Sequence, residues 1–282
     1  FQIIGDSIKI ETYEGFSEFG NLIQGIEQRF TIAEVIGSIA DLKSEKIHEM
    51  IKQYHIEDKL FYLGSDKYGR SVLSRLLLGI RVSLIVGFIA VIISLTLGII
   101  IGAIGGYYGG SIDNFVMLLI NTVWSIPTLL LVFAIVLALG RGVGIIFLAV
   151  GLTMWVEVAR IVRGQVKYFK ESQFIDAARS MAYSNWRIIT KHILPNIIGP
   201  VLVIAAANFA TAILIEAGLS YLGFGIRPPS PSLGNLLNEN YGYALNGKAW
   251  LAIVPALTIM LLVLSFNILG NTLRDIFDVK ED

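Results

Sequence analysis

The chain has 282 residues, of which 55% are hydrophobic and only 16% are charged, and its mean hydropathy is +0.69. A soluble domain has about a quarter of its residues charged, so this composition excludes an ordinary soluble globular protein and indicates an integral membrane protein. The formal net charge is zero, and the chain has no cysteine, which excludes disulfides, thiolate metal sites and cysteine nucleophiles.

Residues 1–69 are predicted to form a small region in water outside the membrane. They hold seven Lys/Arg against twelve Asp/Glu, a net charge of −5, whereas residues 160–191 hold seven against two, a net charge of +5. Because basic residues accumulate on cytoplasmic loops, we place 160–191 inside and 1–69 outside. Residues 1–13 have a weak strand-like pattern, and the spacings after Thr31 and Ser44 are typical of helix starts.

Residues 70–81 follow a turn-rich junction and are amphipathic, with Arg75 and Arg81 set among leucines. Arginines of this kind extend to the headgroups while their stems cover apolar surface. We therefore predict an interfacial helix over 70–81, separate from the first membrane span.

Five apolar segments approach the length of about 20 residues that a helix needs to cross the hydrocarbon. They are Val82–Ile104, Ile112–Leu139, Ile145–Ala159, Ile197–Leu219 and Trp250–Leu269. With 160–191 inside, five spans place residues 1–69 outside and residues 271–282 in a cytoplasmic tail. An outer region without a signal peptide implies one more span before residue 1, so we expect six spans in the native chain.

Small residues within the spans indicate surfaces where helices pack, and polar residues within them indicate a translocation path. Glycines recur every four residues from Gly98 to Gly110, a pattern that lets helix backbones approach closely. In the second span, Asn121, Trp124 and Pro127 need protein or water around them. They indicate either a translocation path or a structural kink.

Polar residues also occur in the third and fourth spans. Asn208 and Glu216 join the path candidates, although Glu216 lies near the outer end of its span, which leaves solvation as the alternative. Glu157 lies near the inner end of the third span, where an ion pair with Arg160 or Arg163 is favoured over a proton relay.

The stretch Glu171–Pro195 between the third and fourth spans is polar and basic. Helical spacing predicts one short helix, a turn, an N-cap at Ser184 and a second helix that Pro195 ends. The predicted apolar face of the first helix comprises Phe174, Ala178, Met181 and Ala182. Spacing alone leaves two alternatives open, docking into a groove of another protein and adsorption on the lipid surface.

The amino-acid sequence of this stretch resembles the EAA loop of ABC importer permeases, the element that docks into the nucleotide-binding subunit. The matching residues are Asp176-Ala177-Ala178, Ala182 and Ile193-Leu194-Pro195. Asp176 stands where the family usually has Glu, and Ala182 where it usually has Gly.

Three longer stretches resemble permease subunits of the dipeptide/oligopeptide (nickel) ABC importer family. They are LGSDKYGRSVLSRLLLGIRVSL from Leu63, EAGLSYLGFGIRPPSPSLGN from Glu216 and FNILGNTLRD from Phe266. The resemblance covers Leu63 to Asp278. It implies an all-α, polytopic transmembrane helical bundle of the type I ABC importer permease class, with a small extracytoplasmic N-terminal segment.

The resemblance also implies the remaining assignments. The permease domain is 82–270, with a cytoplasmic coupling loop at 160–195. The residues that would contact the ATPase are Phe174, Asp176, Ala177, Ala178, Arg179, Met181 and Ala182. The implied location is a bacterial or archaeal cell membrane. The implied partners are a second, related permease, two ATP-binding subunits that hold ATP and Mg, and an extracytoplasmic solute-binding protein. Nucleic acid is not an implied partner. The implied cargo is a di- or oligopeptide, with nickel chelates and glutathione as alternatives.

Catalytic motifs are lacking in the sequence. Gly242 to Lys248 has P-loop spacing, but Ala249 replaces the Ser/Thr that holds Mg²⁺, and no protease or esterase signature occurs. The three histidines show no metal-ligand spacing, so we predict no metal site, no cofactor in this chain and no enzymatic activity of its own. An ion-coupled secondary transporter is the alternative from another class, but it needs ionisable residues at the membrane midplane.

Overall fold

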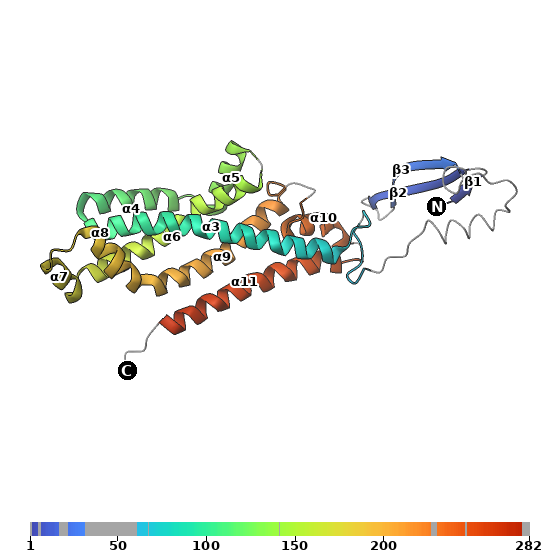
Figure 1. Ribbon diagram of the computed structural model, residues 1–282. Coiled ribbons are helices and arrows are strands. Elements are labelled where there is room, and N and C mark those ends of the chain that lie inside the picture. The colour runs from blue at the N-terminus through green and yellow to red at the C-terminus, as the bar shows by residue number, and fades with distance from the viewer. Residues whose placement is uncertain are drawn as a thin grey trace. The chain divides into compact units, whose positions relative to one another are not determined.

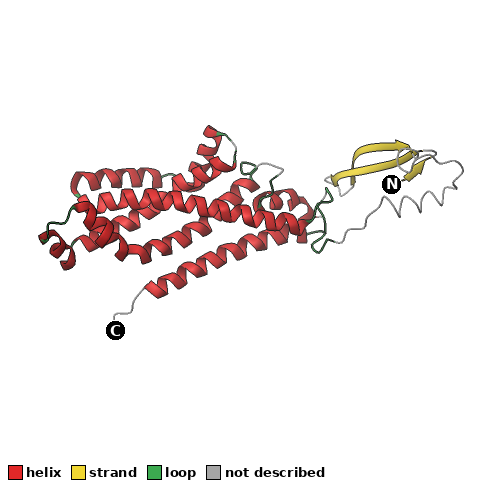
Figure 2. Cartoon of the chain, viewed as in Figure 1, coloured by secondary structure: helices red, strands yellow, loops and turns green. Residues whose placement is uncertain are grey.

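The computed structural model describes residues 2–4, 7–16, 22–31, 61–66, 68–140, 142–226, 230–245 and 247–277. The chain divides into two compact units, Phe1–Arg75 and Leu76–Asp282. Helices dominate the second unit, and strands occur in the first (Figure 2).

The first unit contains a three-stranded antiparallel sheet in the order β1-β2-β3. Its strands are β1 (Gln2–Ile4), β2 (Ser7–Phe16) and β3 (Leu22–Thr31), and Ile8 of β2 is paired with Phe30 of β3. The strand-like pattern of residues 1–13 therefore predicted a real element, which the structure extends to Thr31. The helices predicted after Thr31 and Ser44 lie outside the described residues.

The turn before the first long helix is organised by Asp66, whose side chain is buried. One carboxylate oxygen accepts hydrogen bonds from the backbone N–H groups of Tyr68 and Arg70, both at 2.9 Å. The other accepts from Arg70 Nε at 2.7 Å and Arg75 Nη1 at 2.8 Å. Burial by itself raises the pKa of Asp66, but these hydrogen bonds and the Arg70 charge outweigh it, so the pKa lies below its ordinary value.

Five membrane crossings can be assigned in the described part of the chain. Four helical segments are long and apolar enough to cross singly, and a bent helix pair makes the fifth when it is counted as one span. The four are α3 (Val72–Tyr108), α6 (Val143–Lys170), the run Asn185–Tyr221 that ends in α9 (Ile198–Tyr221), and α11 (Trp250–Phe277) (Figure 1). The bent pair is α4 (Gly110–Trp124) and α5 (Thr128–Leu139). With the bent pair counted as one span, these segments match by length and composition the five spans that the hydropathy pattern predicted.

The first span differs from the prediction at its outer end. A separate interfacial helix over 70–81 was predicted, but α3 runs without a break from Val72 through 37 residues. At 1.5 Å per residue it is about 55 Å long, well beyond the roughly 30 Å of the hydrocarbon. The predicted boundary at 81/82 is wrong because arginine is a good helix former and neither a proline nor a cap separates the two segments.

The glycines of α3 allow it to pack closely against α6. A Cβ atom at Gly98 would lie 2.4 Å from Val158 Cβ, and one at Gly102 would lie 2.5 Å from the Ala159 carbonyl oxygen. The prediction that these glycines serve packing is confirmed for both. It is wrong for Gly110, which has no such neighbour and instead takes a left-handed conformation (φ +55°) at the start of α4.

The second span is broken at Ser125–Pro127, where α4 and α5 meet at 84°. Proline has no N–H to donate and disfavours helical geometry in the residue before it, so the helix ends there. The structural kink that we kept as an alternative is therefore present.

The region after α9 was predicted as a long outer loop over 219–249, but it contains a further helix, α10 (Leu233–Leu245). A Cβ atom at Gly234 would lie 2.2 Å from the Ala217 carbonyl oxygen of α9, so the two helices touch at this glycine. Asn238 Nδ2 donates to the Tyr221 carbonyl at 2.7 Å. In Figure 1, α10 lies at one end of the helical unit and α7 (Gln173–Ser180) at the other.

Candidate coupling surface and membrane path

The loop between the third and fourth spans has the predicted order of helix, turn and helix. The third span continues as α6 to Lys170, and α7 follows after a two-residue turn. Ser184 caps α8 (Asn185–Arg187) by accepting a hydrogen bond from Arg187 N at 3.4 Å, which confirms the predicted N-cap.

The predicted end of the second helix at Pro195 is wrong. After α8 the backbone forms a π-helix over Ile188–Ile193, a 3₁₀-helix over Leu194–Ile197 and then α9. Pro195 lies in the first turn of the 3₁₀-helix, where its missing N–H costs little. The change of hydrogen-bond register therefore accommodates the proline without ending the helical run.

The apolar face predicted for α7 is buried at one residue and exposed at the others. Ala178 is buried, and beside it lies the buried Ile175, which the sequence prediction missed. Both pack with Ile188 and Ile193 against valines of α6. The spacing of Ile175 and Ala178, three residues apart, was the signal that could have identified this inner face. Ala178 is thus part of the core that supports α7.

The remaining predicted coupling residues are on the outside of α7 and the following turn. Phe174 is 42% exposed and Met181 is 59% exposed. Asp176 and Arg179 form an exposed ion pair at 3.1 Å. The exposed predicted residues are Phe174, Asp176, Ala177, Arg179, Met181 and Ala182, and we call these six the coupling surface.

Ala182 has a positive φ of +57°, and it is the sole non-glycine residue with positive φ among those that the structure describes. Its backbone N–H donates to the Arg179 carbonyl at 2.9 Å, and Tyr183 N donates to the Ala178 carbonyl at 3.2 Å. This is a left-handed helix C-terminus, a position that favours glycine. The geometry explains why a residue without a side chain suits this turn.

Two of the path candidates of the second span, Asn121 and Trp124, contact Arg160 of α6. The Arg160 guanidinium lies 3.6 Å from the centre of the Trp124 ring, and Arg160 Nη2 donates to Asn121 Oδ1 at 3.5 Å. Asn121, Trp124 and Pro127 are all exposed on the isolated chain. These residues therefore form a polar, aromatic surface at the broken span.

The path candidates of the fourth span are buried instead. Glu216 is fully buried and accepts hydrogen bonds from Ser83 Oγ at 2.9 Å and Ser220 Oγ at 2.7 Å, so the alternative that it is solvated is wrong. Asn208 is 1% exposed, and neither of its side-chain polar atoms has a hydrogen-bond partner among the described residues. Glu216 joins α3 to α9, and neither residue lines an exposed surface in the isolated chain.

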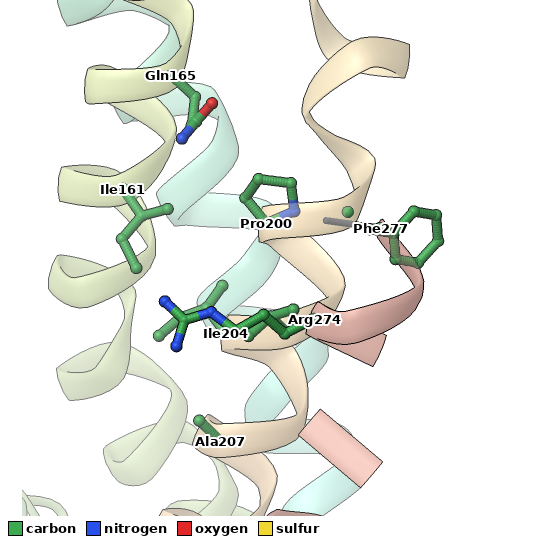
Figure 3. Close-up of a pocket in the computed structure, with 9 residues that line it drawn as sticks. Ile161, Gln165, Pro200, Ile204, Ala207, Arg274 and Phe277 are labelled. Atoms are coloured by element: carbon green, nitrogen blue, oxygen red, sulfur yellow. The ribbon is translucent and has the colours of Figure 1, made fainter. Parts of the chain in front are cut away.

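A cavity of about 380 Å³ lies between α6, α9 and α11. Figure 3 shows the Arg274 side chain extending from α11 toward Ile161 of α6, with Gln165 on the same wall as Ile161. Across the described residues, no group of three or more His, Asp or Glu side chains is placed to hold a metal ion.

The bundle and its exposed loop define a multi-pass membrane protein of the importer-permease class. Residues 94–280 match the family described as "Binding-protein-dependent transport system inner membrane component". The match covers more than half of the chain, and the chain belongs to this family, as the resemblance of its loop and spans indicated.

Relatives and solved structures agree with this assignment. The chain is 37% identical over 238 residues to the dipeptide transport system permease protein DppC of Bacillus subtilis, covering 83% of this chain and 74% of that one. It is 37% identical to the DppC protein of Lactococcus lactis over 79% of this chain but only 65% of that relative's length. It is 39% identical to the glutathione transport system permease protein GsiD of Escherichia coli O157:H7, over 78% of this chain and 72% of that one.

The fold itself matches a chain of the MetNI methionine ABC transporter in an inward-facing conformation. The TM-score is 0.59 at 18% identity, over 73% of this chain and 96% of that one. At this identity the likeness supports the fold alone.

Proposed function

We propose that this chain is a membrane-spanning permease subunit of an ATP-driven importer, and that with a second, related permease it forms the path for di- or oligopeptides. One observation carries the proposal. A short helix with small residues, α7, is held on a buried isoleucine and alanine and presents the coupling surface away from the membrane spans.

The geometry of α7 supports docking into a groove of another protein. Ala177 is exposed and small, so a partner backbone can approach it closely, and the exposed Phe174 and Met181 flank it with apolar area. Asp176 and Arg179 provide a polar pair at the rim. Because Ile175 and Ala178 are packed against α6, a force on α7 reaches the spans directly.

The energy for uphill transport would then come from two partner subunits that bind ATP and Mg. This chain would act without enzymatic activity or a cofactor of its own, and an extracytoplasmic binding protein would deliver the cargo. The dipeptide permease relatives favour a peptide cargo, and the glutathione permease relatives favour glutathione as the alternative.

Co-purification of the ATPase subunits with an Ala177→Trp variant tests the docking. We expect the variant to insert into the membrane and keep its thermal unfolding temperature but to lose the ATPase subunits, because Ala177 is exposed on α7. Ala177→Ser is the matched control and should retain them. Unchanged association of Ala177→Trp would remove the proposal, as would ion-driven uptake by this chain alone.

Identifying the solute that the cognate binding protein retains tests the cargo. Retention of short peptides supports the proposal. Retention of glutathione or a nickel chelate in place of peptides would keep the architecture and overturn the peptide assignment.

A further inference from the structure

Glu157 lies near the middle of helix α6. The sequence analysis placed it near the inner end of a span ending at Ala159, and the structure continues α6 beyond that residue, from Val143 to Lys170. Glu157 is 14 residues from the first of these and 13 from the second, which at 1.5 Å per residue is about 20 Å from either end. Its side chain is exposed on the isolated chain, so water or a positive charge must meet the carboxylate in the assembled protein.

The arginines nearest in sequence are engaged elsewhere. Arg163 forms a bidentate ion pair with Asp113 of α4. Arg160 lies over the Trp124 ring and donates to Asn121. The ion pair predicted for Glu157 is therefore not formed, and within the described ranges the structure gives this carboxylate no cation.

Glu157 lines a small cavity at the broken span. The cavity is about 30 Å³, and its walls include Trp124 and Thr128 from either side of the break, Thr153 of α6 and Thr211 of α9. That volume takes one or two water molecules or an ammonium group of similar size. It is too small for a guanidinium or for a whole peptide.

The polar atoms of the cavity are mainly acceptors. The Thr153 hydroxyl donates to the Val150 carbonyl at 2.9 Å and the Thr211 hydroxyl donates to the Ala207 carbonyl at 3.0 Å. Both hydroxyl oxygens are thereby left to accept, as is the Glu157 carboxylate. An acceptor site next to a negative charge matches a compact donor with a positive charge.

We propose that the cavity at the broken span binds a protonated amino group, and that Glu157 selects cargo by that group as it passes. The inference rests on the proposed function for the identity of the cargo. The broken span places the site beside the exposed surface of Asn121 and Trp124, so the cargo reaches it from the path. The occupant that we propose for the cavity is the ammonium group of a short peptide. A lysine of the partner permease is the rival occupant.

The binding test uses the assembled importer in lipid nanodiscs and difference infrared spectroscopy of carboxyl groups. Methylammonium chloride is the probe, and sodium chloride at the same concentration controls for ionic strength. We expect a shift of a carboxyl band with methylammonium alone, and no such shift in the Glu157→Gln variant. An equal response to both salts, or a response that persists in Glu157→Gln, would overturn the site.

The transport test follows dialanine uptake into proteoliposomes that contain the whole importer and its binding protein. Loss of a hydrogen bond to a charged group corresponds to a loss of about tenfold or more, so Glu157→Gln should slow uptake by about tenfold. Glu157→Asp should recover most of the rate, and Asp275→Asn, an exposed acid at the end of α11, is the control that should not change it. Basal ATP hydrolysis should be unchanged in the Asp275→Asn control.

The outcomes separate the two proposals. Uptake by Glu157→Gln at the wild-type rate overturns the role of Glu157 and leaves the importer assignment intact. Loss of the partner permease from the Glu157→Gln complex identifies the rival occupant and also overturns it. Failure of the wild-type importer to retain ATPase subunits or to take up any peptide overturns the proposed function, whereas the methylammonium result stands independently.

Discussion

The Arg163 guanidinium donates two hydrogen bonds to the Asp113 carboxylate, one of them from Nη2 at 2.6 Å. The pair joins α6 to the first turn of α4, and both side chains are mostly buried. It lies beside a cluster in which Val116 and Ile120 of α4 pack on Val156 and Ala159 of α6. This pair therefore fixes the inner half of the broken span against its neighbour.

We expect Asp113→Asn and Arg163→Lys each to destabilise the chain by about 2 kcal/mol, because each removes charged hydrogen bonds and leaves a mostly buried partner. Thermal unfolding of the purified chain in detergent measures the effect, and a double-mutant cycle isolates the coupling of the pair. The exposed pair Asp176–Arg179 is the internal control, since removal of a surface pair costs about 0–1 kcal/mol. Equal losses of stability at the Asp113–Arg163 and Asp176–Arg179 pairs would contradict the burial of the first pair.

Gly102→Val should disrupt the packing of α3 on α6. A Cβ atom there would lie 2.5 Å from a backbone carbonyl oxygen, so the helices must separate, and we expect a loss of about 2 kcal/mol or more. Gly164→Ala on α6 is the control, because a Cβ at Gly164 would have no neighbour within 4 Å. Replacing a helical glycine with alanine should add about 0.5–1 kcal/mol of stability there. The same thermal unfolding assay distinguishes the two, and a stable Gly102→Val chain would be inconsistent with this helix contact.

Ala182→Gly should stabilise the coupling loop by about 1 kcal/mol, because glycine adopts the left-handed conformation without the strain that a Cβ imposes. Ala182→Val should destabilise it, since a β-branched residue resists positive φ. Hydrogen exchange of the amides of Met181 to Tyr183, followed by mass spectrometry, reports the change locally. Slower exchange is expected in the glycine variant and faster exchange in the valine variant; the reverse order would show that the turn has another geometry.

The Asp66 turn should weaken in acid. The folded pKa of Asp66 is lowered, so its contribution to stability is present above the unfolded pKa near 3.8 and is lost as the pH falls through the lower folded value. Protection of the Tyr68 and Arg70 amides, corrected for the intrinsic effect of pH on exchange, should therefore decline below about pH 4. Asp66→Asn should show the reduced protection already at neutral pH. A variant as protected as the wild type would mean that the backbone turn forms without the carboxylate.

The sequence predicted the elements whose signals are local, and it missed those that depend on neighbours. The apolar runs predicted five spans, and Ser184 predicted a cap, since hydropathy and capping act within a few residues. The inward face of Ile175 and Ala178 depends on valines of α6, which the spacing of α7 alone does not reveal. The burial of Glu216 depends in the same way on Ser83 of α3, more than one hundred residues away.

Boundaries were the other source of error. Lys167 and Lys170 indicated a loop, but α6 continues to Lys170, because a helix that extends beyond the membrane tolerates charge. Pro195 was read as a helix end, because the change of register that accommodates it leaves no mark in the sequence.

The π- and 3₁₀-turns between Ile188 and Ile197 mean that α8 and α9 are joined by helical backbone throughout. A displacement imposed on α7 and α8 would then be carried into the fourth span through continuous helical backbone. The loop and the fourth span thus form one continuous lever, which would transmit the work of a motor subunit docked on α7.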